Sequence, residues 1–557
     1  MLISQFLHNI TNEALNNLFK ANGIDTSKAP NFTIEKPKNK DFGDYATSLP
    51  LQISKLFSKK PSELAEIIID LLPPTEEIDE YSFAHPGFIN FKLSNKWLNN
   101  ELINIVKLTT NYGKYLGSKN QNIQVEFVSV NPTGRLHLGH IRGAVIGSTV
   151  SNVLENQNFS VTREYYVNDA GNQMDNFCKS IIERIKQINK KPFNITEDHY
   201  KGEDIVEIAK GLASTYKSTN FNDISGELFE EIKQKGMEIC ISNIKSDLSL
   251  LDINHDNWFY ESSLIKSNYL KDTLHKLDEL DLTYNKDGAL WIKTEELGDD
   301  RDNVLIKSND KKPTYFATDI AYHRNKFEER KFNKVINLWG ADHHGHIKRM
   351  ELILDKLGNN SRNLKVLLNQ IVSLKSSSGT SKFSKREGNS IYIKDLIEDI
   401  GSDACRFSFL NRSADSQMEI DVDIFKKQSS ENPVFYIQYA HARMCSILNS
   451  SADFNASGSG ADPNLLSNQD EITLIKKLLE YPEMLHRVSL TLNVHELPSF
   501  SLDLAQLIHK FYEKNRVIDK DLNNIEITKS RLLLVNASKI ILSNLLRLMG
   551  MKSPEKM

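Results

Sequence analysis

A chain of 557 residues is too long to fold around a single hydrophobic core, so its length predicts three or four domains. Hydrophobic residues make up 39% and charged residues 25% of the chain, as is typical of globular proteins. The net charge of −4 argues against a protein that coats nucleic acid non-specifically, so any RNA contact must come from local basic patches.

The cysteine pattern and the N-terminus indicate a soluble, cytoplasmic protein. The four cysteines are scattered and form no C-x-x-C pair, so we expect neither disulfides nor a zinc site built on cysteines. Residues 1–20 have apolar positions at helical spacing but polar interruptions, which predicts an amphipathic helix and not a signal peptide. No apolar run approaches the roughly 20 residues needed to cross a bilayer.

The first 110 residues or so predict a small α+β module. After the first helix comes a basic segment at 36–40, then a helix at 61–72 that begins on Pro61, a residue suited to the first helical turn. Residues 88–93 follow a Pro-Gly turn and have the composition of a strand.

The middle of the chain predicts a doubly wound nucleotide-binding sheet. A strand at 123–127, a break at 131–134, a helix from Gly139 onward and a strand at 161–167 form its opening unit. Further strands are expected at 335–339 and 364–368. We expect the intervening residues, from about 175 to 290, to be a mostly helical, charged insertion.

The last part of the chain predicts helices only. A stretch rich in Ser, Gly and Ala at 449–463 is typical of a linker. Helical patterns follow at 472–479, 497–512 and 532–548.

Two short segments carry the candidate chemistry. His137-Leu138-Gly139-His140 lies where a loop becomes a helix, so we expect unpaired backbone N–H groups and the positive end of the helix dipole to face outward. Two imidazoles there can donate hydrogen bonds to phosphate oxygens, although in a chain with 15 histidines the pattern can also arise by chance. The cationic segment 381–389 suits a leaving pyrophosphate, although alone a charged loop is usually a solvated surface.

Together these segments, 242 residues apart (382 − 140), resemble the HIGH and KMSKS signatures of class I aminoacyl-tRNA synthetases. Longer stretches resemble the arginyl-tRNA synthetase family specifically; they are 125–143, 167–173, 313–323, 340–345 and 432–443. Leu138 and Phe383 depart from the usual signatures, where isoleucine and methionine are typical.

The resemblance implies an α/β plus all-α protein with three domains. These are an N-terminal α+β module at 1–110 that grips the tRNA elbow, a Rossmann-type catalytic domain at 111–400 with its helical insertion, and a helical anticodon-binding domain at 401–557. It also implies ATP with Mg²⁺ as cofactors, tRNA(Arg) and L-arginine as partners, and a monomer.

The residue roles also come from the resemblance. The implied catalytic groups are His137, His140, Lys382 and Lys385. The implied arginine site contains Glu126, Ser129, Asn131, His137, Tyr315, Asp319 and His343. The implied ATP site contains Pro132, His137, Leu138, Gly139, His140, Gly340, Asp342, Lys382, Phe383, Ser384 and Lys385.

Physical chemistry supports a guanidinium site but leaves alternatives. A carboxylate suits a guanidinium because it accepts two parallel hydrogen bonds, and Tyr315 and Asp319 share one face if they lie on a helix. Without the resemblance, a Tyr–Asp hydrogen bond that supports the sheet would be the simpler interpretation. Whether Asp342 or His343 contacts arginine stays open.

For tRNA, the implied contacts are Tyr512, Arg516 and Met557, where an aromatic can stack on splayed bases. Phe511 belongs to an apolar stripe and is expected to pack in the core.

The implied reaction activates arginine as an adenylate and transfers it to the 2′-hydroxyl of the terminal adenosine, with bound tRNA required for the first step. Three alternatives fit the sequence less well. A small-molecule adenylyltransferase leaves 432–443 unexplained, a non-catalytic relative should have lost its histidines and lysines, and a synthetase for another amino acid leaves Tyr315 and Asp319 unexplained.

Overall fold

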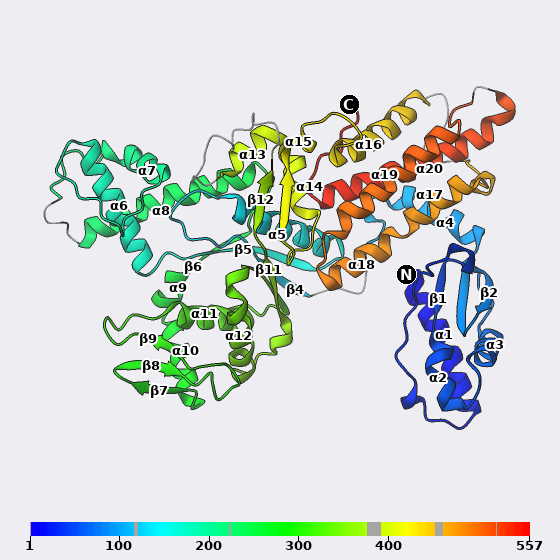
Figure 1. Cartoon of the computed structure of the whole chain (residues 1–557), viewed down its shortest axis with the longest axis horizontal. Coiled ribbons are helices and arrows are strands. Elements are labelled where there is room, and N and C mark those ends of the chain that lie inside the picture. Colours follow the sequence, from blue (N-terminus) through cyan, green and yellow to red (C-terminus); the bar gives the residue numbers. More distant parts are fainter. Residues whose placement is uncertain are drawn as a thin grey trace.

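The computed structural model describes residues 2–115, 121–221, 224, 226–375, 391–451, 460–519 and 521–557. Figure 1 shows an N-terminal lobe that stands apart, a central sheet flanked by helices, and a group of long helices between the two. This arrangement confirms the predicted combination of an α/β domain with a small N-terminal module and a helical C-terminal part.

The N-terminal lobe is the predicted α+β module. Its helices are α1 (Ile3–Ala21), α2 (Leu49–Phe57) and α3 (Pro61–Leu71), and its strands are β1 (Tyr45–Thr47), β2 (Ile78–Ala84) and β3 (Phe88–Leu93). The strands form an antiparallel sheet in the order β1-β3-β2. Pro61 occupies the first turn of α3, where its missing N–H leaves no hydrogen bond unmade.

The central sheet has five parallel strands in the order β11-β10-β4-β5-β6. They are β4 (Asn122–Glu126), β5 (Ser160–Val167), β6 (Asn257–Tyr260), β10 (Lys334–Gly340) and β11 (Leu364–Asn369). Starting at β4, the strands β5 and β6 follow on one side of the sheet, and β10 and β11 follow on the other side. Helix α5 (Leu138–Asn156) is buried along most of its length. A doubly wound sheet opens a crevice at the carboxyl ends of the strands where the order reverses, here between β4 and β10.

The segment between β5 and β10 contains short strands as well as helices. It begins with α6 (Asn172–Ile188), α7 (Glu203–Ala213) and α8 (Gly226–Ser249). The chain then returns to the sheet as β6, followed by α9 (Glu261–Lys266), α10 (Tyr269–Glu279), β7 (Thr283–Lys286), β8 (Ala289–Ile292) and β9 (Asn303–Ile306). Residues 175–290 are mostly helical, as expected, but β6, β7 and β8 were not predicted, because four-residue strands are too short to show a clear alternation.

After β11, the described residues form helices except for a small parallel pair of strands, β12 (Val372–Lys375) and β13 (Met418–Asp421). Its helices are α13 (Ile393–Ile400), α14 (Ser402–Leu410), α15 (Val422–Phe425), α16 (Pro433–Ser450), α17 (Gln469–Leu479), α18 (Tyr481–Thr491), α19 (Glu496–Lys514) and α20 (Ile525–Leu548). Helix α4 (Asn95–Leu108) links the N-terminal lobe to this part and lies against it. Among the described residues, no helix combines the length and apolarity needed to cross a bilayer.

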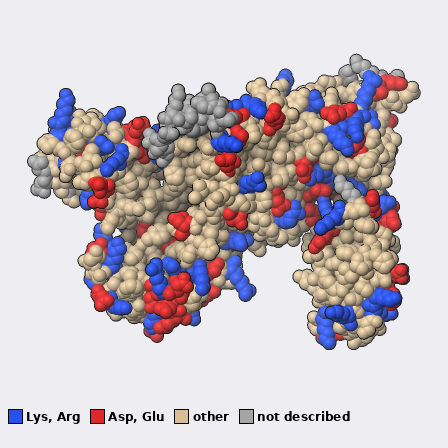
Figure 2. All heavy atoms as spheres, in the orientation of Figure 1, with Lys and Arg blue, Asp and Glu red and all other residues tan. Residues whose placement is uncertain are grey.

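Polar contacts join the N-terminal lobe to α17 and α18. Lys36 Nζ lies 2.5 Å from Glu480 Oε1, and Lys476 Nζ donates to Asp44 Oδ1 at 2.6 Å. Ser4 donates to the carboxylate of Glu483 through both its backbone N–H and its hydroxyl. Figure 2 shows basic and acidic side chains interspersed over most of one face, with acidic ones gathered at the lower left, on the part of the molecule that contains β7, β8 and β9.

Candidate active site

A cavity of about 1760 Å³ lies at the carboxyl ends of β4 and β10. Its walls come from the loop after β4, the start of α5, the end of β5, α9, α11 (Tyr315–Arg324) and the segment after β10. Pockets for one drug-sized ligand are about 300–1,000 Å³, so this cavity has room for more than one small substrate. Most of the expected site residues line it: Glu126, Ser129, Asn131, His137, Gly139, His140, Tyr315, Asp319, Gly340, Asp342 and His343.

His137 and His140 form a reciprocal cap on the first turn of α5. His137 Nδ1 accepts from Gly139 N–H at 3.3 Å, and His140 Nδ1 accepts from His137 N–H at 3.4 Å. Burial, together with the adjacent His137 ring, lowers the pKa of His140 to about 3. An uncharged imidazole that accepts through Nδ1 carries its proton on Nε2. His140 can therefore donate to a substrate oxygen through Nε2. His137 also accepts through Nδ1 in this cap, so its Nε2 can donate in the same way.

The expectation of unpaired N–H groups at this helix start was wrong for the first three. Leu138 N–H donates to the carbonyl of Ile391 at 3.0 Å, Gly139 N–H donates to His137 Nδ1, and His140 N–H donates to the carbonyl of His137 at 2.9 Å. The loop into α5 packs against 391–392, which gives Leu138 N–H its acceptor. Attraction of a phosphate to this end of α5 therefore depends on the helix dipole and the imidazoles.

Two expected ATP residues do not line the cavity, because Pro132 and Leu138 are buried. Leu138 belongs to the hydrophobic core, and Pro132 is buried in the loop before it. Lys382, Phe383, Ser384 and Lys385 lie outside the described residues.

Acidic side chains gather at the inner end of the cavity. Glu126 ends β4, Asp319 lies on α11, and Glu261 begins α9, and all three are buried. Burial alone would raise the pKa of Asp319, but contacts with His323 and His346 hold it well below its usual range. Asp319 is therefore an anion. Partial enclosure and the charges of Asp319 and Glu126 raise the pKa of the Tyr315 phenol well above its usual value, as expected beside a negative pocket.

The alternative interpretation of Tyr315 and Asp319 is not observed. Both lie on α11, but the partners of the Asp319 carboxylate are His323 Nδ1, 3.1 Å from Oδ1, and His346 Nε2, which contacts Oδ2. Tyr315 is half exposed (50%) and faces the cavity beside the rings of His343 and His346.

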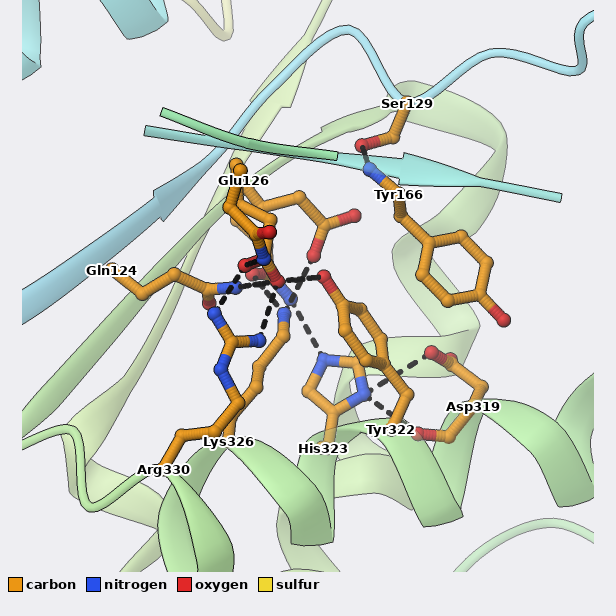
Figure 3. A network of polar contacts seen from close by, with 12 residues as sticks. Gln124, Glu126, Ser129, Tyr166, Asp319, Tyr322, His323, Lys326 and Arg330 are labelled. Atoms are coloured by element: carbon orange, nitrogen blue, oxygen red, sulfur yellow. Dashed lines mark hydrogen bonds and ion pairs between the residues drawn. The ribbon is translucent and has the colours of Figure 1, made fainter. Parts of the chain in front are cut away.

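Beneath the acidic pocket lies a buried polar network (Figure 3). Lys326 Nζ donates to Glu126 Oε2 at 2.5 Å and to Asn337 Oδ1 at 3.0 Å. Lys326 belongs to a π-helical turn, Asn325–Glu329, that continues α11. Such turns are often found at functional sites, and this one directs a fully buried ammonium toward the end of β4.

The outer part of the pocket contains polar groups that suit the α-amino end of an amino acid. Asn131 Nδ2 donates to Gln173 Oε1 at 2.5 Å, and both side chains line the cavity. Ser129 Oγ accepts from the backbone N–H of Tyr166 at 3.1 Å. Asp342 is largely exposed at the rim, whereas the His343 ring lies against Trp339 and Tyr315.

Sequence reasoning assigned no role to Lys326, His346, Asn337 or Glu261. Lys326 and Asn337 stand in segments that resemble ordinary helix and strand, and no short motif marks either one. His346 follows the segment 340–345 by one residue, so its proximity was the only available signal. His323 was part of a quoted stretch, but its contact with Asp319 depends on the geometry of α11.

A second cavity, of about 790 Å³, lies between α16, the end of α19 and the C-terminus. It brings together the expected tRNA residues Tyr512, Arg516 and Met557 and adds Arg443. The Arg443 guanidinium lies 4.6 Å from the Tyr512 ring centroid and 4.8 Å from that of Tyr439. Phe511 is buried (1%), which confirms its predicted core position.

Three family descriptions match consecutive parts of the chain. They are "Arginyl tRNA synthetase N terminal domain" at residues 5–93, "tRNA synthetases class I (R), catalytic domain" at 101–422, and "DALR anticodon binding domain" at 437–557. The catalytic match alone spans more than half of the chain.

Full-length relatives agree with these matches. The arginine–tRNA ligase of Dehalococcoides mccartyi (strain CBDB1) is 42% identical over 525 residues, which cover 94% of each chain. That of Desulfitobacterium hafniense (strain DCB-2) is 39% identical over 543 residues, which cover 97% of this chain and 96% of the relative.

Solved structures show the same similarity. A structure from Campylobacter jejuni, described as an arginyl-tRNA synthetase, is 32% identical with a TM-score of 0.75, and the match covers 84% of this chain and all of that one. The Thermus thermophilus arginyl-tRNA synthetase matches both chains in full with a TM-score of 0.78; at 18% identity it shows the fold alone.

Proposed function

The chain belongs to the arginyl-tRNA synthetase family, whose members charge tRNA(Arg) with arginine, and we propose that the cavity between β4 and β10 is where both steps occur. In the first step, the arginine carboxylate attacks the α-phosphate of ATP, giving arginyl-adenylate and pyrophosphate. In the second, the 2′-hydroxyl of the terminal adenosine takes the arginyl group and AMP leaves. No step needs a covalent enzyme intermediate, so catalysis depends on positioning and charge stabilisation.

The anionic Asp319 at the inner end of the cavity is the observation on which the arginine site depends. Its carboxylate, with that of Glu126, suits a planar guanidinium that donates in parallel, and Tyr315 covers the outer side. Lysine would be disfavoured because a single ammonium cannot satisfy a site shaped for a fork. Ser129 and Asn131 would hold the α-amino end, and His343, which lies beside Tyr315, is our choice over the exposed Asp342.

The ATP phosphates would lie at the start of α5. His137 and His140 can donate through Nε2 without adding a fixed charge, and Gly139 allows close approach of the nucleotide. Gly340 and Asp342 would form the opposite wall of the ATP site. Lys382 and Lys385 would stabilise the leaving pyrophosphate. Mg²⁺ would arrive bound to the phosphates and neutralise part of their charge.

For the tRNA, we propose that the cavity lined by Tyr512, Arg516 and Met557 receives anticodon bases and that the N-terminal lobe contacts the elbow. We propose further that bound tRNA is required for adenylate formation, that the protein acts as a monomer, and that it works in the cytoplasm. The domain divisions at about 110 and 400 belong to this proposal.

The decisive experiment is ATP–pyrophosphate exchange with each amino acid, with and without tRNA(Arg). Arginine with tRNA should drive exchange, whereas lysine and glutamate should not. Exchange driven by another amino acid would contradict the assignment of the pocket. Strong exchange with arginine alone would contradict only the requirement for tRNA.

A further inference from the structure

A chain of polar contacts connects the two carboxylates of the proposed arginine pocket through the protein interior. Hydrogen bonds run from Lys326 to Glu126, from Lys326 to Asn337 and between Asn337 and His323, and the His323 ring then contacts Asp319. The three intermediate side chains are essentially inaccessible to solvent (0–1%). Figure 3 shows the ring of His323 between Asp319 and the network below β4. Water therefore cannot form hydrogen bonds with these groups, and each donor must face an acceptor within the protein.

The direction of every hydrogen bond in this chain follows from Lys326. An ammonium only donates, so the Asn337 atom that lies 3.0 Å from Lys326 Nζ must be the carbonyl oxygen. The amide nitrogen of Asn337 then faces His323 Nε2 at 2.7 Å and donates to it. Because Nε2 accepts, it holds no proton, and the proton of the ring is on Nδ1. Nδ1 lies 2.8 Å from the Asp319 carbonyl and 3.1 Å from its Oδ1, both acceptors.

We propose that Lys326 and Asn337 hold His323 as the neutral Nδ1–H tautomer, so that Asp319 is oriented by a hydrogen bond while its negative charge stays available to the arginine guanidinium. This inference rests on the proposed role of Asp319 in arginine binding. His323 is a positioning residue here, since it acts on the substrate only through Asp319.

The alternative protonation state shows why the tautomer matters. An imidazolium at His323 would form an internal ion pair with Asp319 and place a positive charge beside the incoming guanidinium. Like charges at such short range in a buried site repel strongly. Asn337 prevents this state because its N–H group occupies the position that a second proton on Nε2 would need. His346, which contacts Oδ2 of Asp319 from α12 (His344–Lys356), Glu261 from α9 and Tyr315 also face this carboxylate, but none of them contacts His323 Nε2.

Replacing Asn337 by aspartate reverses the direction of the hydrogen bond between residue 337 and His323 without changing the shape of the side chain. A carboxylate accepts from Lys326 and also from a protonated Nε2, so the Asn337→Asp change should make His323 an imidazolium. We expect the KM for arginine in tRNA charging to rise at least tenfold, with the KM for ATP changed less than twofold. A direct effect of the added negative charge would act in the opposite direction, since it would attract the cation.

The same change made in a His323→Asn background isolates the mechanism. The asparagine amide nitrogen occupies the place of Nδ1 but offers no second protonation site, so Asn337→Asp should now change the arginine KM less than twofold. An equal rise in both backgrounds would overturn the proposal. An unchanged KM in the wild-type background would also overturn it if Asp319→Asn raises the arginine KM. If Asp319→Asn leaves that KM unchanged, the proposed arginine site is wrong instead.

The tautomer can be measured independently of enzyme activity by NMR of protein labelled with ¹⁵N-histidine. The His323 signals are identified by their loss in the His323→Asn variant. The unsubstituted protein should show a protonated Nδ1 and an unprotonated Nε2, and the Asn337→Asp variant should show protons on both. A proton on Nε2 in the unsubstituted protein would overturn the proposal even if the variants failed to fold.

Discussion

Asp319 is the buried anion on which arginine binding is expected to depend most. The Asp319→Asn change keeps the size of the side chain but removes its charge and one acceptor. Hydrogen bonds to charged groups contribute about 1.5–3 kcal/mol, so the KM for arginine should rise roughly ten- to a hundredfold. Steady-state tRNA charging with arginine and ATP varied in turn measures this. Asp287→Asn, in the turn between β7 and β8, is the matched control, and a similar rise there would contradict the assignment.

His140 should make the protein sensitive to acid. Its pKa is about 3 in the folded state and about 6.5 when the chain is unfolded, so below pH 6.5 the unfolded chain binds a proton that the folded chain does not. Stability should therefore fall as the pH drops from 6.5 toward 3. Urea unfolding at pH 7.5 and pH 5 should show a smaller loss of unfolding free energy in His140→Gln than in the unsubstituted protein. Equal losses in the two proteins would count against the buried, neutral state of His140.

The end of α19 and the residues just after it carry two of the proposed tRNA contacts. Phe511 packs into the core, while Tyr512 and Arg516 face the cavity that also contains Arg443 and Met557. Arg516→Ala should raise the KM for tRNA(Arg) about 5- to 150-fold, since a contact of this kind is worth roughly 1–3 kcal/mol, and should leave the KM for arginine within twofold. Charging assays at varied tRNA concentration test this.

Lys514→Ala is the control for that experiment. Lys514 ends α19, two residues before Arg516, and carries the same charge, but its Nζ lies 3.5 Å from Asp470 Oδ2 and it is outside the cavity. An effect as large as that of Arg516→Ala would mean that this region attracts tRNA through its overall charge and not through this cavity.

At the scale of elements, the sequence predicted the strands and helices that have a regular apolar pattern. The unit β4–loop–α5, the remaining long strands and the long C-terminal helices were found because their apolar periodicity extends over several residues. The strand β6 and the small sheet β7–β9 were missed because four-residue strands carry little periodicity. The helix α11 was expected to bring Tyr315 and Asp319 to one face, and it does, yet the partners of Asp319 come from its own next turn and from α12.

The buried network shows the other limit of sequence reasoning. Glu126 is 200 residues from Lys326 in the chain, and Lys326 and Asn337 lie on different elements, so only the packing of the π-helical turn against β4 and β10 brings the three together. A lysine in a charged helix is usually solvated, so its full burial was not predictable from its neighbours. The capping role of His137 and His140 was likewise hidden, since a short H-x-G-H pattern does not reveal which amides it will occupy.

At the scale of the whole molecule, one buried arginine connects three distant segments. Arg406, on α14, donates to the carbonyl of Leu251 at 2.6 Å, to the carbonyl of Met549 at 2.5 Å and to Ser148 Oγ at 3.1 Å. These acceptors follow α8, follow α20 and lie on α5, respectively. The C-terminal tail then continues past α16 to Met557 at the second cavity (Figure 1). Arg406 and the C-terminal tail therefore connect α5, which His137 caps, to the proposed tRNA cavity.

Gly550 offers a test of this connection, because it has a left-handed backbone (φ +69°) and an added Cβ would lie 2.1–2.3 Å from the Arg406 guanidinium. Gly550→Ala should lower the unfolding free energy by roughly 2–4 kcal/mol, from backbone strain of about 1–2 kcal/mol plus overpacking. Gly358→Ala is the matched control. Gly358 also has a positive φ (+85°), but no other atom lies within 4 Å of its added Cβ, so only the strain applies. Denaturant unfolding compares the two, and in an Arg406→Lys background, where the side chain ends earlier, the excess cost of Gly550→Ala should fall toward zero. An excess cost that persists there would show that Arg406 is not what Gly550 accommodates.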